Sequence, residues 1–301
     1  MSGTVCVIGL GSMGYGAAVT LLRAGVAVRG VDVREDALAS LRQEGGEPAA
    51  TPAEGASGAD AVITFVVDAD QTEEVLLGEH GAAMTMNTGS GVVIACATVA
   101  PARAERLAAR LAERGCTMLD APVSGGATGA ATGELTVMAS GSAEAFRRAD
   151  PYLSVIAAKV YHLGEEPGQG SRVKMINQLL AGVHIAATAE AMALGIRAGI
   201  DPDTLYEVIS NSAGSSWMFR NRAPHILAGD YTATSAVDIF VKDLGIVLET
   251  GRSLTFPLPL AASAHQLFTM ASAQGLGRED DSAVIKVYAA NTGIPLPGAD
   301  G

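Results

Sequence analysis

The sequence has few cysteines, few aromatic residues and a deficit of positive charge. Its 301 residues include three cysteines, one tryptophan and 20 lysines and arginines against 32 aspartates and glutamates, a formal net charge of -12. An odd number of widely spaced cysteines, each in an apolar stretch, disfavours a disulfide framework and favours reduced, buried thiols. The negative charge disfavours nucleic acids and acidic membranes as partners, because both usually bind a basic patch.

Signals for export, membrane insertion and metal binding are also missing. No charged segment precedes the first apolar run, so we expect residues 1–9 to form a first strand and not a signal peptide. The Ala-rich run after Gln178 is interrupted by His184, Glu190 and Arg197, which favours a buried helix over a membrane span. Histidines, cysteines and carboxylates show no metal-ligand spacing, so no metal is expected. These observations predict a soluble, cytoplasmic protein.

The order of apolar patterns predicts two domains. Strand-like and helix-like segments alternate up to about residue 164, and no convincing strand follows. The predicted strands are 4–8, 26–33, 61–67, 91–97, 117–119, 135–140 and 158–163. Such alternation predicts a Rossmann-type, doubly wound, mainly parallel sheet. We therefore expect an α/β dinucleotide-binding domain at 1–165 and an all-helical substrate and oligomerisation domain at 166–301, joined by a long interdomain helix.

A glycine-rich turn directly follows the first predicted strand. It consists of Gly9, Leu10, Gly11, Ser12, Met13 and Gly14, and a helix-like stretch continues to about residue 24. In a dinucleotide site the first glycine permits the tight turn, the second lets the backbone approach a pyrophosphate, and the third allows close packing of helix on strand. The alternative is a tight turn in an ordinary βα unit, which the register of strand, turn, helix and second strand disfavours.

An acidic residue ends the second predicted strand. Asp32 lies 18 residues after Gly14, close to the spacing of about 20 expected for a carboxylate that binds the adenosine ribose. It indicates NAD. Arg34 could instead meet the 2′-phosphate of NADP, although Asp32 would repel that phosphate. Val66 and Val67, at the end of the third predicted strand, are further expected cofactor contacts.

The segment from Gly168 to Gly199 predicts a long central helix with one polar cluster near its start. Lys174, Asn177 and Gln178 are spaced by three and four residues, so they share one helical face. A second set at helical spacing has only small side chains and would let another helix approach closely: Gly182, Ala186, Ala189 and Ala193.

Lys174 is the candidate general acid/base. An amine beside a positively charged nicotinamide has a lowered pKa, which lets it accept a hydroxyl proton as hydride leaves the carbon. Asn177 and Gln178 could orient that hydroxyl. The alternative is a surface lysine, the commoner situation for an isolated lysine on a helix.

Four motifs together resemble the β-hydroxyacid dehydrogenase family, which includes 3-hydroxyisobutyrate dehydrogenase and tartronate semialdehyde reductase. They are Gly9 to Gly14, Asp120-Ala121-Pro122-Val123-Ser124-Gly125-Gly126, Gly168 to Gln178, and Lys242-Asp243-Leu244. The resemblance covers nearly the whole chain. It implies a catalytic role for Lys174, a substrate-carboxylate site at Ser124, Gly125 and Gly126, a place for Thr98 beside the nicotinamide, contact of Lys242 with cofactor and substrate, and a homodimer or homotetramer.

One position departs from the family pattern. Many members carry Asn four residues after the lysine, where this chain has Gln178, with Asn177 just before it. Both amides therefore remain candidates for substrate binding.

The segments 179–190 and 225–248 are similar to the branch of the family that acts on L-threonate. This resemblance implies NAD-dependent oxidation of the C2 hydroxyl of a four-carbon sugar acid to a 2-oxo acid. Asp238 could bind an extra hydroxyl, or it could be only a helix-surface or capping carboxylate. Alternatives are 3-hydroxyisobutyrate or tartronate semialdehyde as substrate. A non-catalytic dinucleotide-binding protein or an imine reductase is less favoured, because Lys174 and the Ser124-Gly125-Gly126 site are both retained.

Overall fold

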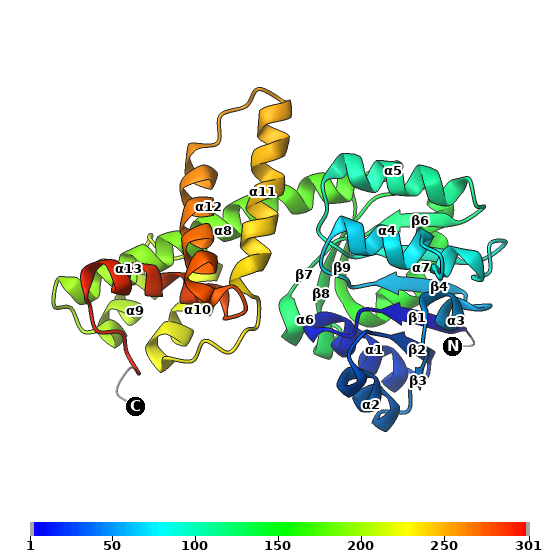
Figure 1. Cartoon of the computed structure of the whole chain (residues 1–301), viewed down its shortest axis with the longest axis horizontal. Coiled ribbons are helices and arrows are strands. Elements are labelled where there is room, and N and C mark those ends of the chain that lie inside the picture. The colour runs from blue at the N-terminus through cyan, green and yellow to red at the C-terminus, as the bar shows by residue number, and fades with distance from the viewer. Residues whose placement is uncertain (1–2, 299–301) are drawn as a thin grey trace. The chain divides into compact units, whose positions relative to one another are not determined.

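The computed structural model describes residues 3–298, and the chain divides into two compact units, Met1–Lys174 and Met175–Gly301 (Figure 1). The boundary falls inside helix α8 (Gln169–Arg197). We had expected it just before this helix, at 165/166. The helix that we expected to join two domains is therefore part of both units.

A six-stranded, fully parallel sheet forms the centre of the first unit. Its strands run in the order β3-β2-β1-β4-β5-β6. Their bounds are β1 Thr4–Ile8, β2 Ala27–Val31, β3 Glu47–Pro48, β4 Ala61–Thr64, β5 Val92–Ala95 and β6 Thr117–Asp120. This is the predicted Rossmann-type sheet. Its strand order reverses between β1 and β4, the point at which such sheets bind ligands.

Helices cover both faces of this sheet, as a doubly wound fold requires (Figure 1). Residues on one face, such as Val5 and Ile63, pack with α1 (Ser12–Arg23), α2 (Glu35–Gln43), α6 (Gly126–Thr132) and α7 (Ala143–Ile156). Residues on the other face, such as Val62 and Val93, pack with α3 (Pro52–Ala56), α4 (Ala69–Leu77) and α5 (Pro101–Ala112). The central strands β1, β4 and β5 read as nearly continuous apolar runs because almost all of their residues are buried.

Two of the predicted strands belong to a second, smaller sheet. Strands β7 (Val123–Ser124), β8 (Leu135–Ala139) and β9 (Ala157–His162) pair in that order, antiparallel and then parallel. We had assigned the segments at 135 and 158 to the main sheet, and that detail was wrong. Only an isolated antiparallel bridge between Asp120 and Ser140 pairs the end of β6 with the end of β8. The two-residue β7 turns the chain back after β6, too short a strand to be visible in the sequence.

The second unit is helical over its described residues, with an isolated bridge between Ala236 and Asp280. After α8 come α9 (Pro202–Ser210), α10 (Trp217–Ala228), α11 (Val237–Ser253), α12 (Pro259–Ala271) and α13 (Ile285–Thr292). Phe240 and Phe268 stack in its core, with ring centroids 5.1 Å apart.

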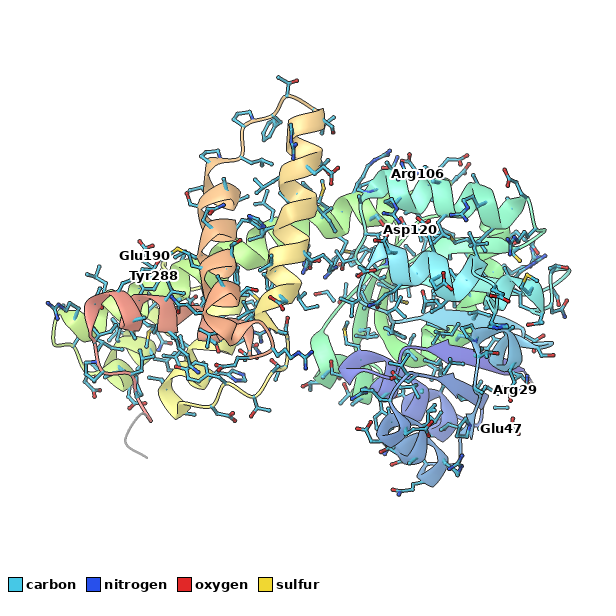
Figure 2. The ribbon with its side chains drawn as sticks, in the orientation of Figure 1. Arg29, Glu47, Arg106, Asp120, Glu190 and Tyr288 are labelled. Atoms are coloured by element: carbon cyan, nitrogen blue, oxygen red, sulfur yellow. The ribbon has the colours of Figure 1, made fainter. Side chains whose placement is uncertain are left out.

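The small-residue face of α8 packs in this core, as predicted. Gly182, Ala186, Ala189 and Ala193 are buried, and a Cβ on Gly182 would lie 3.0 Å from Leu244 and Phe240 of α11. Farther along α8, the Tyr288 hydroxyl of α13 donates to Glu190 at 2.7 Å (Figure 2). By length and composition alone α8 could cross a membrane. Packing of its small-residue face accounts for part of this composition, since 44% of the apolar window is buried in the structure.

Candidate active site

The glycine-rich turn after β1 has the geometry of a dinucleotide site. Gly9 has a φ of +89°, and a Cβ on Gly14 would lie 1.8 Å from the Gly9 carbonyl oxygen. Both positions therefore need glycine for the chain itself to fold. Gly11 differs, because a Cβ there would meet nothing within 4 Å. Glycine at Gly11 is thus not required by the protein's own packing, which is expected if a ligand approaches the backbone there.

Helix α1 begins directly behind this turn. Its N-cap, Gly11, offers no side-chain cap, and the first turn contains no acidic residue. The first N–H groups of a helix carry partial positive charge and need acceptors. A pyrophosphate fits this position in charge and hydrogen bonding.

Asp32 follows β2 and lies against the same turn. Its carboxylate accepts from the Leu10 N–H at 2.6 Å and from the Arg34 N–H at 2.9 Å. The Arg34 guanidinium lies 3.5 Å from Asp32 and donates to the Leu10 carbonyl at 3.0 Å. Arg34 is thus held by the carboxylate that we assigned to the ribose, which fits NAD better than a free arginine would.

Three further predicted residues follow the carboxyl ends of neighbouring strands. Val66 and Val67 come after β4, which ends at Thr64 and not at Val67 as expected, and Thr98 comes after β5. Val67 is 49% exposed, so the strand we predicted as buried ends before it. Carboxyl ends of parallel strands share one edge of the sheet. The structure therefore places these residues at the same edge as Gly9.

The loop that carries Ser124, Gly125 and Gly126 leads from β7 into α6. Gly125 and Gly126 have φ values of +125° and +64°, and both are exposed. Helix α6 packs against the dinucleotide helix α1, where Thr20 donates to the Ala130 carbonyl at 3.0 Å. A Cβ on Gly16 would lie 2.9 Å from the Ala131 nitrogen. The loop proposed to hold a carboxylate is thus fixed to the helix proposed to hold the cofactor.

Lys174 lies on α8, one turn after the helix begins, and only 7% of it is exposed. The alternative of an exposed surface lysine is therefore wrong. Close packing explains the second glycine of the Gly168-Gln169-Gly170 motif that precedes Lys174. A Cβ on Gly170 would lie 2.2 Å from the Met138 carbonyl oxygen. The start of α8 is consequently pressed against the ends of β6 and β8.

In the second unit, a chain of polar contacts joins four residues of two motifs. The Asn177 amide donates to Gln178 at 3.0 Å, and the Gln178 amide donates to Asp243 at 2.5 Å. The ammonium of Lys242 lies 2.7 Å from the other Asp243 oxygen. The structure thus brings Asn177, Gln178 and Lys242 together through Asp243, which is 1% exposed.

Two carboxylates were missed as functional candidates. Asp120 and Asp243 each lie inside a motif that we singled out, but only the fold shows their partners on α8, distant in sequence. Asp238 accepts from the Ser272 hydroxyl at 2.6 Å, and a Cβ on Gly277 would lie 2.4 Å from its carboxylate. Asp238 is exposed in the first turn of α11, which has no side-chain cap, so these contacts favour a helix-surface carboxylate.

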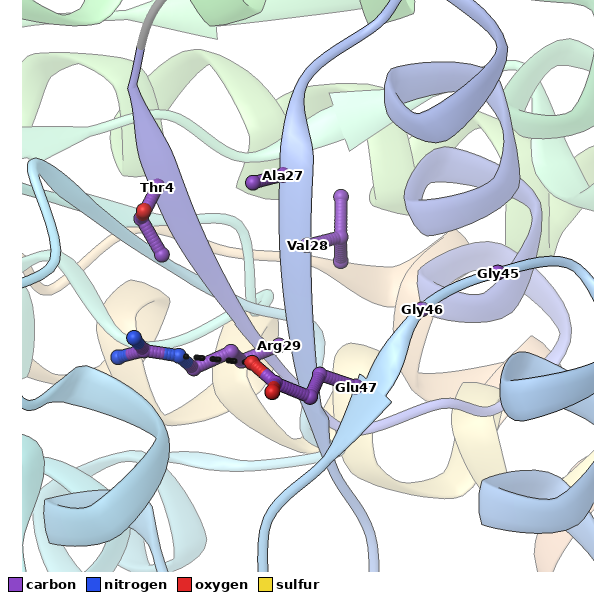
Figure 3. A pocket seen from close by; sticks show the side chains of 7 residues that line it. All are labelled: Thr4, Ala27, Val28, Arg29, Gly45, Gly46 and Glu47. Carbon is purple, nitrogen blue, oxygen red and sulfur yellow. Dashed lines mark hydrogen bonds and ion pairs between the residues drawn. The ribbon is translucent and has the colours of Figure 1, made fainter.

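One cavity of the first unit lies away from this site. It has a volume of about 260 Å³ and lies where β1 and β2 begin, beside the pair formed by Arg29 and Glu47 (Figure 3). The glycine-rich turn follows the opposite ends of these strands. The cavity is therefore separate from the proposed cofactor site.

The three cysteines are buried and free, as predicted. Burial raises the pKa of the Cys6 thiol to about 12, so it is protonated and unreactive at neutral pH. Among the described residues, no group of three or more metal-ligating side chains comes together.

The first unit combines a parallel sheet, a glycine-rich turn and a buried lysine, and these features define a dinucleotide-binding oxidoreductase. Residues 4–164 match the family model of the NAD binding domain of 6-phosphogluconate dehydrogenase. Residues 168–288 match that of the NAD-binding domain of NADP-dependent 3-hydroxyisobutyrate dehydrogenase. The chain belongs to the β-hydroxyacid dehydrogenase family, in its 3-hydroxyisobutyrate dehydrogenase-like group, and its cofactor is NAD.

Relatives are similar over almost their whole length. An L-threonate dehydrogenase of Cupriavidus necator is 61% identical and covers 99% of each chain. One from Escherichia coli K12 is 54% identical over 98% of this chain and 97% of its own. A crystal structure described as 3-hydroxyisobutyrate dehydrogenase from Salmonella typhimurium is 53% identical, with a TM-score of 0.90 over 95% of this chain and 100% of its own.

Proposed function

We propose that this enzyme oxidises the C2 hydroxyl of L-threonate with NAD, giving the 2-oxo acid 2-dehydro-L-erythronate. The observation that carries this choice of substrate is the identity of 61% and 54%, over nearly full length, with two L-threonate dehydrogenases. The site supports the reaction class independently, because it combines a dinucleotide turn with a buried lysine.

A second candidate is the oxidation of 3-hydroxyisobutyrate. It is favoured by the Salmonella typhimurium structure, which carries that description at 53% identity. Tartronate semialdehyde reduction uses the same proposed residues. These substrates differ in the groups next to the carboxylate, so a comparison of rates decides among them.

The first unit supplies the residues for NAD. The turn from Gly9 to Gly14 and the start of α1 hold the pyrophosphate, Asp32 binds the adenosine ribose, and Val66, Val67 and Thr98 line the edge toward the nicotinamide. When bound, NAD accepts the hydride that leaves C2. The open space at Gly11 and the uncapped start of α1 support this assignment.

Lys174 acts as the general base. As the C2 hydride leaves, its neutral amine takes the hydroxyl proton, and in the reverse direction its ammonium returns that proton to the alkoxide. Burial supports this role, since a lysine that is 7% exposed is shielded from water and held in one place.

The substrate carboxylate binds to the Ser124 hydroxyl and to the N–H groups of Gly125 and Gly126. Their left-handed backbone supports this role, because successive N–H groups in such a turn can point to one anion. Lys242 adds positive charge. Asn177 and Gln178 act as one hydrogen-bonded pair, with Asp243 orienting Gln178.

We also propose a soluble, cytoplasmic homodimer or homotetramer. The loop between α11 and α12 and the start of α12 expose Leu254, Phe256 and Leu260, which are 71%, 62% and 69% exposed. A partner subunit would cover such apolar surface. Light scattering coupled to size-exclusion chromatography tests this, and a monomer would contradict it.

The deciding experiment follows NADH formation with L-threonate, D-threonate, the erythronates, 3-hydroxyisobutyrate and glycerate. We expect the highest kcat/KM with L-threonate. Turnover of 3-hydroxyisobutyrate without turnover of threonate would overturn the substrate and leave the reaction class in place.

The role of Lys174 is tested by Lys174→Ala. We expect kcat to fall by ~10²–10⁴, the usual contribution of a general base, while NAD binds with unchanged affinity. Lys159→Ala is the matched control, because Lys159 is exposed on β9. Retained turnover in Lys174→Ala would exclude this mechanism.

A further inference from the structure

The carboxylate of Asp120, at the end of β6, is buried against the first turn of α8 (Figure 2). One oxygen accepts from the N–H groups of Gly168 at 2.8 Å and Ser171 at 2.9 Å. The other accepts from the Ser171 hydroxyl at 2.7 Å. Asp120 therefore caps α8 from a different element through three hydrogen bonds.

Two further contacts fix the same turn. The Gly170 N–H donates to the hydroxyl of Ser140, which itself lies 3.3 Å from Asp120. On the outside, Arg172 pairs with Glu105 of α5 at 2.5 Å. Hydrogen bonds and an ion pair thus hold the start of α8 against the ends of β6 and β8 and against α5. Asp120 makes most of the buried contacts among them.

We propose that Asp120 is a positioning residue for Lys174, acting through the first turn of α8. A helix is stiff over one turn, so Lys174, one turn after Ser171, moves with the atoms that Asp120 holds. Displacements of about 1 Å at a reacting group can cost ~10² in rate. The inference rests on the proposed role of Lys174 as general base.

A buried carboxylate is a costly way to cap a helix, which argues that its geometry matters. A serine, threonine or asparagine just before the helix is the ordinary cap. Here the residue before α8 is Gly168, with a φ of +101°, and the cap comes from the strand that leads into the Ser124 loop. The Asp120 carboxylate thus fixes the position of Lys174 relative to β6, the strand that leads to the proposed substrate-carboxylate site.

The test is a double-mutant cycle with Asp120→Ala and Lys174→Ala, in the full-length enzyme with saturating NAD. We expect Asp120→Ala to lower kcat by about 10- to 100-fold and to leave the KM for NAD within about twofold, because the dinucleotide turn follows β1. In the Lys174→Ala background the same change should lower kcat by less than about twofold, since the amine that Asp120 positions is absent. Equal losses in both backgrounds would overturn the inference.

Asp120→Asn separates position from charge. Asparagine keeps an oxygen for the N–H groups of Gly168 and Ser171, and its amide can donate to the Ser171 hydroxyl, which turns to accept. We expect kcat within about threefold of wild type. A loss as large as that of Asp120→Ala would overturn a role in positioning. If Asp120→Ala does not fold, Ser171→Ala removes one hydrogen bond and serves in the same cycle.

Asp201→Ala is the matched control, because Asp201 caps α9 and accepts from the Thr204 N–H at 2.9 Å. It should lower Tm without changing kcat. A fall in kcat for both aspartate variants would indicate a general loss of structure and would contradict the inference.

Failure of the proposed function can be distinguished from failure of the positioning role of Asp120. If the wild type oxidises another hydroxy acid, the cycle is run with that acid. If it oxidises none, amide hydrogen exchange of residues 168–174 decides. Faster exchange confined to this segment in Asp120→Ala supports the positioning role, and unchanged exchange overturns it.

Discussion

Replacing Gly11 with alanine should separate cofactor binding from folding. A Cβ at this position meets nothing within 4 Å, and the backbone is extended, with a φ of -66° and a ψ of -170°. Alanine adopts this conformation without strain, and such replacements usually stabilise a protein by ~0.4–1 kcal/mol. We therefore expect the Tm of the free enzyme to stay the same or rise by about 1–4 °C.

The affinity for NAD should fall in the same variant. The added methyl group would stand between the backbone and the pyrophosphate, and an extra methyl in a close contact costs ~1–3 kcal/mol. This corresponds to a Kd that is about 5- to 150-fold higher. Calorimetric titration with NAD and differential scanning calorimetry measure the two effects.

Two further glycines serve as controls for this prediction. A Cβ on Gly14 would lie 1.8 Å from the Gly9 carbonyl, so Gly14→Ala should lower both Tm and affinity. Gly214, in the second unit, also has open space, and Gly214→Ala should change neither. Unchanged NAD affinity in Gly11→Ala would refute the assignment of this turn to the pyrophosphate.

Two other predictions concern single carboxylates. The wild-type enzyme should have a higher kcat/KM with NAD than with NADP. Asp32→Asn keeps an acceptor for the Leu10 N–H but no longer repels a 2′-phosphate, so it should lower the ratio of kcat/KM for NAD to kcat/KM for NADP. A wild-type preference for NADP would contradict this assignment of Asp32. Burial raises the pKa of Asp120, so its contribution to stability is present below the unfolded pKa, near 4, and is lost as the pH rises through the raised folded pKa. The Tm of Asp120→Asn relative to wild type should therefore increase from pH 4 toward pH 8, and scanning calorimetry showing a decrease would refute this.

Local patterns were sufficient to predict five of the six strands of the main sheet and the cofactor turn. The turn, α1 and Asp32 lie within one βαβ unit, where spacing in sequence reflects distance in space. The separate sheet formed by β7, β8 and β9 could not be predicted, since its antiparallel pair depends on a strand of two residues. In the segment 35–60, which carries no predicted element, β3 and α3 have only two and five residues and are too short to give a periodic pattern.

The polar contacts of α8 lay beyond any local pattern. Asp120 and Ser171 are 51 positions apart, and Gln178 and Asp243 are 65 positions apart. Their motifs marked Asp120 and Asp243 as neighbours of functional residues, but only the packing of α8 on strand ends and on α11 shows what each carboxylate holds. The assignment of Asn177 and Gln178 to the substrate, and of Lys242 to the cofactor and the substrate, remains a prediction.

The position of the unit boundary inside α8 affects how this protein can be divided. A fragment that ends at residue 165 would contain every strand, yet it would lack Gly168 and Ser171, and Asp120 would lose the donors that make its burial tolerable. A fragment that ends at residue 174 would keep them. A division of the chain at the unit boundary therefore leaves Lys174 with the glycine-rich turn, so that an exchange of halves between relatives at this boundary would transfer the proposed base together with the cofactor site.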